Sequence, residues 1–296
     1  QSGAHEENAI FESNQAKSEY GGGAICIGSG KLTVENYTFK GNATNTAEGS
    51  DFRGGGAIRM NSGSSTLTAN NCAFISNISA SCGGAISSKC EATFENCKFD
   101  SNTAINHGGA IIKSGDSKLT LTGTHEDALF INNKAATKNA KKYGGAIYVD
   151  KGTYTIDGYT FEGNSASSGG ALFTLNCTSE ATIKNSIFRS NLAQVGTGQQ
   201  GGAVYINSHN ATITDCKFSG NIASKEGGAI QIWAVGKTVN LTGINPEMAI
   251  FENNQGKTGG AIQVDGGTLT GSGYTFTNNS PDNVAVGTQG TNNYQN

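Results

Sequence analysis

Two short motifs recur along this chain, and they restrict its possible folds more than any other feature. Gly-Gly-Ala followed by Ile, Leu or Val occurs nine times, and Phe-x-x-Asn recurs ten times in phase with it. The alanines of the first motif are Ala24, Ala57, Ala85, Ala110, Ala146, Ala171, Ala203, Ala229 and Ala261. The pairs of the second motif are Phe11 and Asn14, Phe39 and Asn42, Phe74 and Asn77, Phe99 and Asn102, Phe130 and Asn133, Phe161 and Asn164, Phe188 and Asn191, Phe218 and Asn221, Phe251 and Asn254, and Phe276 and Asn279. Successive motif phenylalanines lie 25 to 35 residues apart, a period typical of solenoids and propellers.

The residues between the motifs alternate with the period of β-strands. After each Gly-Gly-Ala the chain alternates, as at 147–149, and a second alternating stretch such as 154–156 follows. This period of two excludes helical repeats. A propeller blade of the WD type needs about 40 residues, whereas the shortest repeat here has 25 residues. We therefore predict an all-β fold, a single-stranded parallel β-helix (solenoid) of about ten coils, in which one repeat forms one coil.

Stacking explains why the motif residues repeat. Coils of a β-helix lie ~4.8 Å apart, so a residue that occurs once per coil forms a column. We expect the phenylalanines to fill the core. We expect the asparagines to turn the chain in a left-handed backbone conformation while their amides hydrogen-bond from coil to coil. We expect the glycines at a corner where φ is positive or where a Cβ would crowd the next coil.

A longer period lies over the short one, because every fourth coil matches. The approaches HEENAIF, HEDALF and NPEMAIF to three of the motif phenylalanines recur roughly 120 residues apart. No linker or shift in composition divides these units, so we predict one domain over residues 1–296. His5 and His125 occupy equivalent places in the four-coil unit, and we interpret them as turn residues rather than metal ligands.

Charge and hydrophobicity exclude several classes of partner. The net charge is -3, and the 20 Lys and Arg residues form no basic stripe beside aromatic residues, so we expect no nucleic-acid partner. No apolar run approaches the ~20 residues that cross a bilayer, so we expect no membrane insertion by this chain. The start at Gln1 lacks the basic and apolar segments of a signal peptide, which favours a mature or excised segment.

The tandem motifs also carry a family resemblance. At this density, and from Phe11 to Asn279, they resemble the repeats of the polymorphic membrane protein family, the chlamydial-type surface adhesins. The resemblance implies a right-handed β-helix passenger region that is exported and displayed extracellularly on the cell surface. It further implies a partner on a host or neighbouring cell, either a surface protein or a glycan.

The outward-facing positions disfavour an enzyme. Many parallel β-helices cleave polysaccharides with carboxylates clustered on the outer face of one sheet. The outward position after each Gly-Gly-Ala holds no acid, and Asp150 and Asp265, two positions further on, are four coils apart, ~19 Å by coil height. We therefore predict no catalytic residues, no cofactor and no metal site. A polysaccharide-acting enzyme stays as a third alternative, because loops can carry chemistry on any fold.

Two of the seven cysteines have the register for a disulfide. Cys72 and Cys97 each stand two residues before the motif phenylalanine in consecutive coils. Their Cα atoms are therefore expected ~4.8 Å apart, within the range that a disulfide spans. Both side chains point inward, so the sequence leaves open whether they form a bond or remain two stacked thiols.

One column of outward positions is apolar and aromatic. Ile112, Tyr148, Phe173 and Tyr205 share the same outward position in four consecutive coils, and Trp233 lies one outward position further along in the fifth. At ~4.8 Å per coil these residues form a predicted contact stripe ~20 Å long, suited to sugar rings or a protein interface. The alternative is that the segments before Gly-Gly-Ala fold over the stripe and bury it.

Two functional hypotheses remain ahead of the enzyme. The first is a non-enzymatic surface adhesin or recognition rod. The second is a structural subunit of an extracellular filament that stacks end to end, because an open β-helix end is an unpaired template for another chain.

Overall fold

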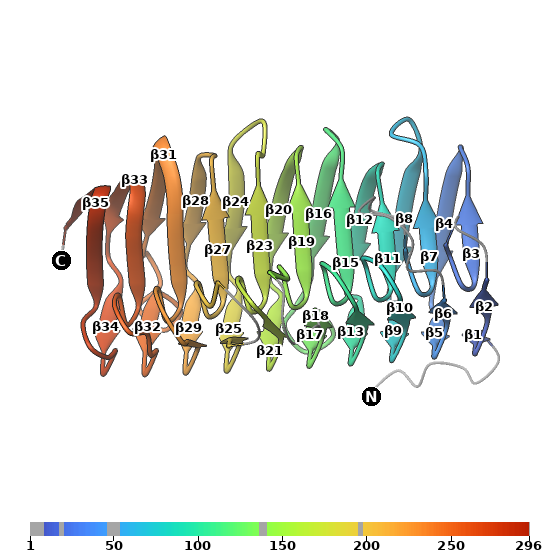
Figure 1. Cartoon of the computed structure of the whole chain (residues 1–296), viewed down its shortest axis with the longest axis horizontal. Coiled ribbons are helices and arrows are strands. Elements are labelled where there is room, and N and C mark those ends of the chain that lie inside the picture. Colours follow the sequence, from blue (N-terminus) through green and yellow to red (C-terminus); the bar gives the residue numbers. More distant parts are fainter. Residues whose placement is uncertain (1–8, 18–20, 46–53, 136–140, 195–197, 296) are drawn as a thin grey trace.

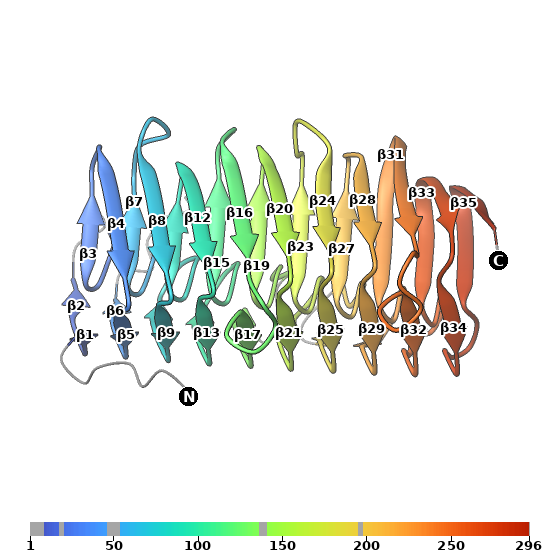
Figure 2. The same ribbon diagram turned by 180° about the vertical axis from the view of Figure 1, so that it is seen from behind.

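The chain winds into an elongated stack of coils. The structure, a computed structural model, describes residues 9–17, 21–45, 54–135, 141–194 and 198–295. The N-terminal coil lies at one end of the long axis and the C-terminal coil at the other (Figure 1). Figure 2 shows the same succession of coils from behind. The strand pairs are parallel and join consecutive coils, and the described residues contain no helix. The predicted all-β parallel β-helix is therefore confirmed.

Three parallel sheets run along the stack. The phenylalanine sheet takes one three-residue strand from each of ten coils: β1 (Ile10–Glu12), β5 (Thr38–Lys40), β9 (Ala73–Ile75), β13 (Lys98–Asp100), β17 (Leu129–Ile131), β21 (Thr160–Glu162), β25 (Ile187–Arg189), β29 (Lys217–Ser219), β32 (Ile250–Glu252) and β34 (Thr275–Thr277). The short sheet takes eight two-residue strands: β2 (Gln15–Ala16), β6 (Ala43–Thr44), β10 (Ile78–Ser79), β14 (Thr103–Ala104), β18 (Lys134–Ala135), β22 (Ser165–Ala166), β26 (Leu192–Ala193) and β30 (Ile222–Ala223).

The third and widest sheet has two rows of strands. The first row follows the Gly-Gly-Ala motifs: β3 (Ile25–Ile27), β7 (Ile58–Met60), β11 (Ile86–Ser88), β15 (Ile111–Ser114), β19 (Ile147–Asp150), β23 (Leu172–Leu175) and β27 (Val204–Asn207). The second row comprises β4 (Lys31–Glu35), β8 (Thr66–Asn70), β12 (Glu91–Glu95), β16 (Lys118–Thr122), β20 (Thr153–Asp157), β24 (Ala181–Lys184) and β28 (Ala211–Thr214). In the last three coils both rows merge into the long strands β31 (Ile230–Thr242), β33 (Ile262–Ser272) and β35 (Val284–Gln295).

The motif phenylalanines form one continuous stack of rings inside the coils. The register pairs each with its equivalent in the next coil, as Phe161 pairs with Phe130 and Phe188. Neighbouring rings are nearly parallel, with interplanar angles of 2 to 6° and centroids 4.5 to 5.0 Å apart. All except the two end members are fully buried. The predicted phenylalanine core is therefore present in register.

The motif asparagines form a hydrogen-bonded ladder beside the rings. The amide Nδ2 of Asn133 donates to Oδ1 of Asn164 and to the carbonyl oxygen of Phe99, each at 2.9 Å, and its backbone N–H also donates to Oδ1 of Asn164. The same pattern runs from Asn14 to Asn254, which donates to Asn279. The coil-to-coil amide bonds are as predicted.

The left-handed turn lies one residue earlier than the sequence suggested. The residue just before each motif asparagine has a positive φ, as in Ser101 (58°), Asn132 (54°) and Gly163 (63°). The motif asparagine itself is not left-handed, because its side chain must point inward to join the ladder. The expectation of a left-handed motif asparagine is therefore corrected.

The two glycines of each pair meet the two expected requirements: the first has a positive φ, and the second lies too close to the next coil for a Cβ. Gly144 has a φ of +65°, whereas a Cβ on Gly145 would lie 2.0 Å from the carbonyl oxygen of Gly170 in the next coil. Only glycine satisfies both positions, because the first needs left-handed backbone and the second has no room for a side chain.

Candidate functional site

The structure covers most of the predicted contact stripe. Ile112, Tyr148, Phe173 and Tyr205 do occupy matching positions in β15, β19, β23 and β27. Their exposed fractions are only 0 to 7%, and together with Cys82 they form a second hydrophobic cluster outside the coils. The prediction of an open aromatic surface is therefore corrected for these four residues, and the alternative of a buried satellite cluster describes them.

A segment that precedes a Gly-Gly-Ala motif provides the cover. The Tyr143 ring stacks on Phe173 with centroids 4.2 Å apart. The His107 ring stacks on Tyr143 and on Tyr148, with centroids 5.1 and 5.0 Å apart. The backbone N–H of Tyr143 donates to Nδ1 of His107 at 3.2 Å. Burial, helped by the charge of Lys142, lowers the pKa of His107 to about 4, so the ring is neutral and accepts this bond at neutral pH.

Trp233 is the one member of the predicted stripe that remains open. Its exposed fraction is 41%, and Val235, the next outward residue of β31, is 54% exposed. In the register of the wide sheet Trp233 pairs with Asn207 on one side and Gly266 on the other. The Val235 side chain lies over this glycine, because a Cβ on Gly266 would lie 2.7 Å from Cγ2 of Val235.

Cys72 and Cys97 are buried neighbours with free thiols. A hydrogen bond between their side chains lowers the pKa of Cys72, whereas burial raises that of Cys97. The Cys72 thiol also donates to the carbonyl oxygen of Asn70 at 3.2 Å, and the Cys97 thiol donates to those of Ala69 and Glu95 at 3.3 Å. The structure thus brings the two predicted partners together as stacked thiols, the second of the two outcomes left open.

A charged hollow lies at the turn between the two rows of the wide sheet. Its volume is about 470 Å³, and it is lined by Gly63, Lys89, Ser114, Gly115, Asp116, Ser117, Asp150 and Lys151. Beneath it, the fully buried Lys113 donates from Nζ to the carbonyl oxygens of Ser114 and Gly115, each at 3.1 Å, and burial lowers its pKa to about 8. Burial and the charge of Asp116 raise the pKa of Asp150.

Sequence reasoning missed Asp116 as a neighbour of Asp150. The prediction considered only the outward positions of the strands, and at these positions Asp150 has no acidic neighbour in the adjacent coils. Asp116 lies outside the strands, in the turn after β15. The two lysines that line the same hollow balance the two carboxylates in charge. The hollow is therefore a mixed-charge surface depression.

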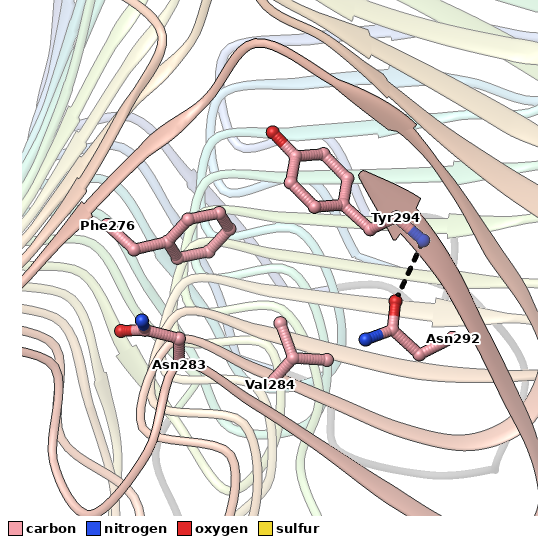
Figure 3. A pocket seen from close by; sticks show the side chains of 5 residues that line it. All are labelled: Phe276, Asn283, Val284, Asn292 and Tyr294. Atoms are coloured by element: carbon pink, nitrogen blue, oxygen red, sulfur yellow. Dashed lines mark hydrogen bonds between the residues drawn. The ribbon is translucent and has the colours of Figure 1, made fainter. Parts of the chain in front are cut away.

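A second hollow lies at the C-terminal end of the core. It has a volume of about 260 Å³ and is lined by Phe276, Asn283, Val284, Asn292 and Tyr294 (Figure 3). The Tyr294 ring meets Phe276, the last ring of the stack, edge-on at 5.7 Å and 79°. Its backbone N–H donates to Oδ1 of Asn292, the dashed line in Figure 3. Tyr294 thus covers part of the end of the phenylalanine stack.

Other chemical features of the described residues are few. Within residues 9–17, 21–45, 54–135, 141–194 and 198–295, no three His, Cys, Asp or Glu side chains are grouped closely enough to hold a metal ion. No helix long and apolar enough to cross a bilayer occurs in this part of the chain. His125 has a φ of 62°, in line with its interpretation as a turn residue, whereas His5 lies outside the described residues.

Comparisons with known proteins match three segments of the chain to a known repeat. Residues 127–150, 158–175 and 215–232 match the sequence model of the Chlamydia polymorphic membrane protein repeat. Each matched segment spans at least one of the two motifs, with its stacked phenylalanine or its paired glycines. The chain is also similar to a protein of Chlamydia pneumoniae named "Probable outer membrane protein pmp7", with 32% identity over 191 residues.

The similarity covers 57% of this chain and 19% of that relative, so the chain spans a small part of the relative's length. No solved structure matches the chain.

Proposed function

We propose that this chain, three segments of which match the polymorphic membrane protein repeat, is a non-enzymatic rod displayed on the extracellular face of a cell. In this proposal it recognises a surface protein or glycan of a host or neighbouring cell. The observation that supports this proposal is that the repeated and the varied residues occupy different faces of each coil. The motif phenylalanines and asparagines point into the core, as the buried Phe161 and Asn164 do, so stacking does not restrict the outward positions.

The outer face of the phenylalanine sheet illustrates this variation. Lys40 and Glu12 form an ion pair at 2.9 Å in the first two coils, and Arg189 and Glu162 form one at 2.7 Å between two central coils. Their side chains are 37 to 52% exposed, so they contribute little to stability. Such exposed groups, which vary along the stack, are suited to recognition rather than to holding the fold. The name of the relative, which places it in an outer membrane, agrees with surface display.

Binding of the purified chain to cultured epithelial cells and to a glycan array tests the proposal. We expect saturable binding that Trp233→Ser weakens, because this indole is the exposed part of the predicted stripe. The matched control is Ile78→Ser, which changes an apolar side chain of the short sheet that is 52% exposed. The absence of saturable binding to any cell or glycan by the folded chain would refute the recognition rod.

A second candidate function is end-to-end assembly into an extracellular filament. Strand β35 pairs with β33, and the described residues place no strand on its other side. This twelve-residue strand contains no charged residue, and such an uncharged edge favours pairing with another strand. Light scattering over a concentration series tests it, because a recognition rod keeps a constant mass whereas a filament subunit grows with concentration.

A further inference from the structure

The outward column of the first row changes from aromatic to amide side chains after Tyr205. Gln231 in β31 and Gln263 in β33 continue the column and are paired in register, so their side chains lie one above the other in consecutive coils. Both are buried, with exposed fractions of 0% and 5%. Buried glutamines need partners for both the amide nitrogen and the amide oxygen.

Both glutamine nitrogens turn to the same carboxylate. Nε2 of Gln231 donates to Oδ2 of Asp265 at 2.9 Å, and Nε2 of Gln263 donates to Oδ1 at 2.6 Å. Gln231 makes one further long contact, from Nε2 to the carbonyl oxygen of Ile232 at 3.4 Å. Asp265 reaches both amides because it lies in a β-bulge, where it and Gly266 together oppose Trp233.

Both glutamine oxygens lack a partner. Oε1 of Gln231 and Oε1 of Gln263 are inaccessible to solvent and accept no hydrogen bond from any described residue. The motif asparagines show the alternative, because their stacked amides donate to one another from coil to coil. The two glutamines form no such ladder, because their nitrogens donate to Asp265 instead. Each unpaired buried oxygen destabilises the fold unless a donor or a cation meets it.

The charges around the glutamines are negative. Asp265 forms no ion pair with a Lys, Arg or His within the described residues. Glu226 lies directly before the Gly-Gly-Ala motif that precedes Gln231. Burial raises the pKa of the Tyr205 phenol, and the charges of Asp265 and Glu226 raise it further. Glu226 accepts a hydrogen bond from Nε2 of Gln200, whereas Asp265 has no ion pair in the described part of the chain. A cation is therefore an occupant that satisfies both the unpaired glutamine oxygens and the Asp265 carboxylate.

We propose that Gln231, Gln263 and Asp265 form a binding site for a hard divalent cation of the Ca²⁺ class. An amide oxygen lies ~2.2 Å from its nitrogen, so each Oε1 is at most about 5 Å from the Asp265 oxygen that its nitrogen contacts. Two oxygens bound to one Ca²⁺ at 2.3 to 2.6 Å can be up to about 5 Å apart. A half-turn of each glutamine amide exchanges Oε1 and Nε2 and brings both oxygens to the Asp265 carboxylate, so that the three side chains can contact one ion, and water completes the shell.

The donor set selects the ion. Amide and carboxylate oxygens suit Ca²⁺, whereas Zn²⁺ prefers the nitrogen and sulfur ligands that are absent from these three side chains. Flexible glutamines also suit Ca²⁺ better than Mg²⁺, which demands near-ideal octahedral geometry. One carboxylate and neutral amides give a weak site, in the affinity range of about 10⁻⁴ to 10⁻³ M typical of extracellular Ca²⁺ modules.

Terbium luminescence tests the site with a reporter that the chain already contains. Tb³⁺ occupies Ca²⁺ sites and emits when an excited indole nearby transfers its energy, and the single tryptophan, Trp233, pairs with the neighbour of Asp265. We expect Tb³⁺ emission on tryptophan excitation that excess Ca²⁺ abolishes. Asp265→Asn is expected to weaken Tb³⁺ binding at least tenfold. The matched control, Asp150→Asn, changes an outward aspartate four coils away and is expected to leave binding unchanged.

A second variant guards against a simple loss of folding in Asp265→Asn. Gln263→Lys places an ammonium group beside Asp265, so we expect it to abolish Tb³⁺ binding and to make the thermal unfolding midpoint independent of Ca²⁺, while the wild-type midpoint rises with Ca²⁺. Emission that Ca²⁺ does not displace, or equal Tb³⁺ affinity of wild type and Asp265→Asn, would overturn the proposal and leave buried water as the partner of the glutamine oxygens. Cell binding is not part of this readout, so the site and the proposed adhesion fail or hold separately.

Discussion

Replacing Phe161 with alanine removes a ring that is sandwiched between two others in the middle of the stack. Phe161 is fully buried, and its ring lies 4.8 Å from Phe130 and 4.7 Å from Phe188. Core Phe→Ala changes cost ~3 to 5 kcal/mol, and each lost aromatic pair is worth ~0.5 to 1.5 kcal/mol. Because Phe161 takes part in two such pairs, we expect a loss at the upper end, about 4 to 5 kcal/mol in the free energy of unfolding.

Phe276→Ala is the matched control within the same motif. Phe276 is only half-buried and stacks on one ring, that of Phe251 at 5.0 Å, so its loss is expected to cost about 1 to 2 kcal/mol. Urea unfolding followed by circular dichroism and by Trp233 fluorescence measures both. The two signals must change together for a free energy to be defined, because repeat proteins can unfold in parts. Equal urea midpoints for the two variants would refute the argument that the stacked ring column holds the coils together.

Three further predictions concern other parts of the coil. The pKa of His107 is lowered to about 4 in the folded chain, so the unfolded chain binds this proton at higher pH. The free energy of unfolding is therefore expected to fall as the pH drops from about 6.5 to 4. Urea midpoints across this range check the prediction, and a midpoint that does not fall would contradict it. Gly145→Ala is expected to lower the free energy of unfolding by at least ~1 to 3 kcal/mol, because the new Cβ overpacks against the next coil. Gly28→Ala is expected to be near neutral in the same urea assay, because the space around its Cβ is open. Similar losses of stability for both variants would argue against the close approach at Gly145. Thiol labelling of the native chain is expected to modify Cys26 alone, because it is exposed and the other six cysteines are buried, whereas all seven react in denaturant; mass spectrometry counts the labels.

Residues that occur once per coil were predictable, and residues that depend on neighbouring segments were not. The columns of Phe161 and Asn164 follow from spacing alone, because stacking turns a repeat along the chain into a contact between coils. Spacing alone did not decide between an open and a buried Tyr148, the two alternatives for the stripe. Its cover is provided by His107 and Tyr143, which lie in segments of unequal length without a repeated pattern.

The setting of Asp265 was hidden for a related reason. Counting by twos along the strand correctly placed it outside the coil, but the bulge that turns its carboxylate to the glutamines is an irregularity in the pairing of β31 with β33. A period of two describes only regular strands. The one-residue shift of the left-handed turn has a simpler origin, because Asn is common both in left-handed turns and in amide ladders, and the sequence does not separate the two roles.

The direction of the bonds between coils determines how the molecule responds to mechanical load. Hydrogen bonds such as that from Asn133 to Asn164 run from one coil to the next, along the long axis, so tension applied between the two ends of the rod pulls each bond along its own length. In the isolated chain of residues 1–296 the terminal coil has a neighbour on one side only, so it is expected to detach first. Each detached coil of, for example, the 27 residues from Phe161 to Phe188 releases about 90 Å of extended chain in exchange for ~4.8 Å of rod. A rod of this kind lengthens in steps under tension, and the remaining coils keep their outward surfaces intact while the end coils absorb the extension.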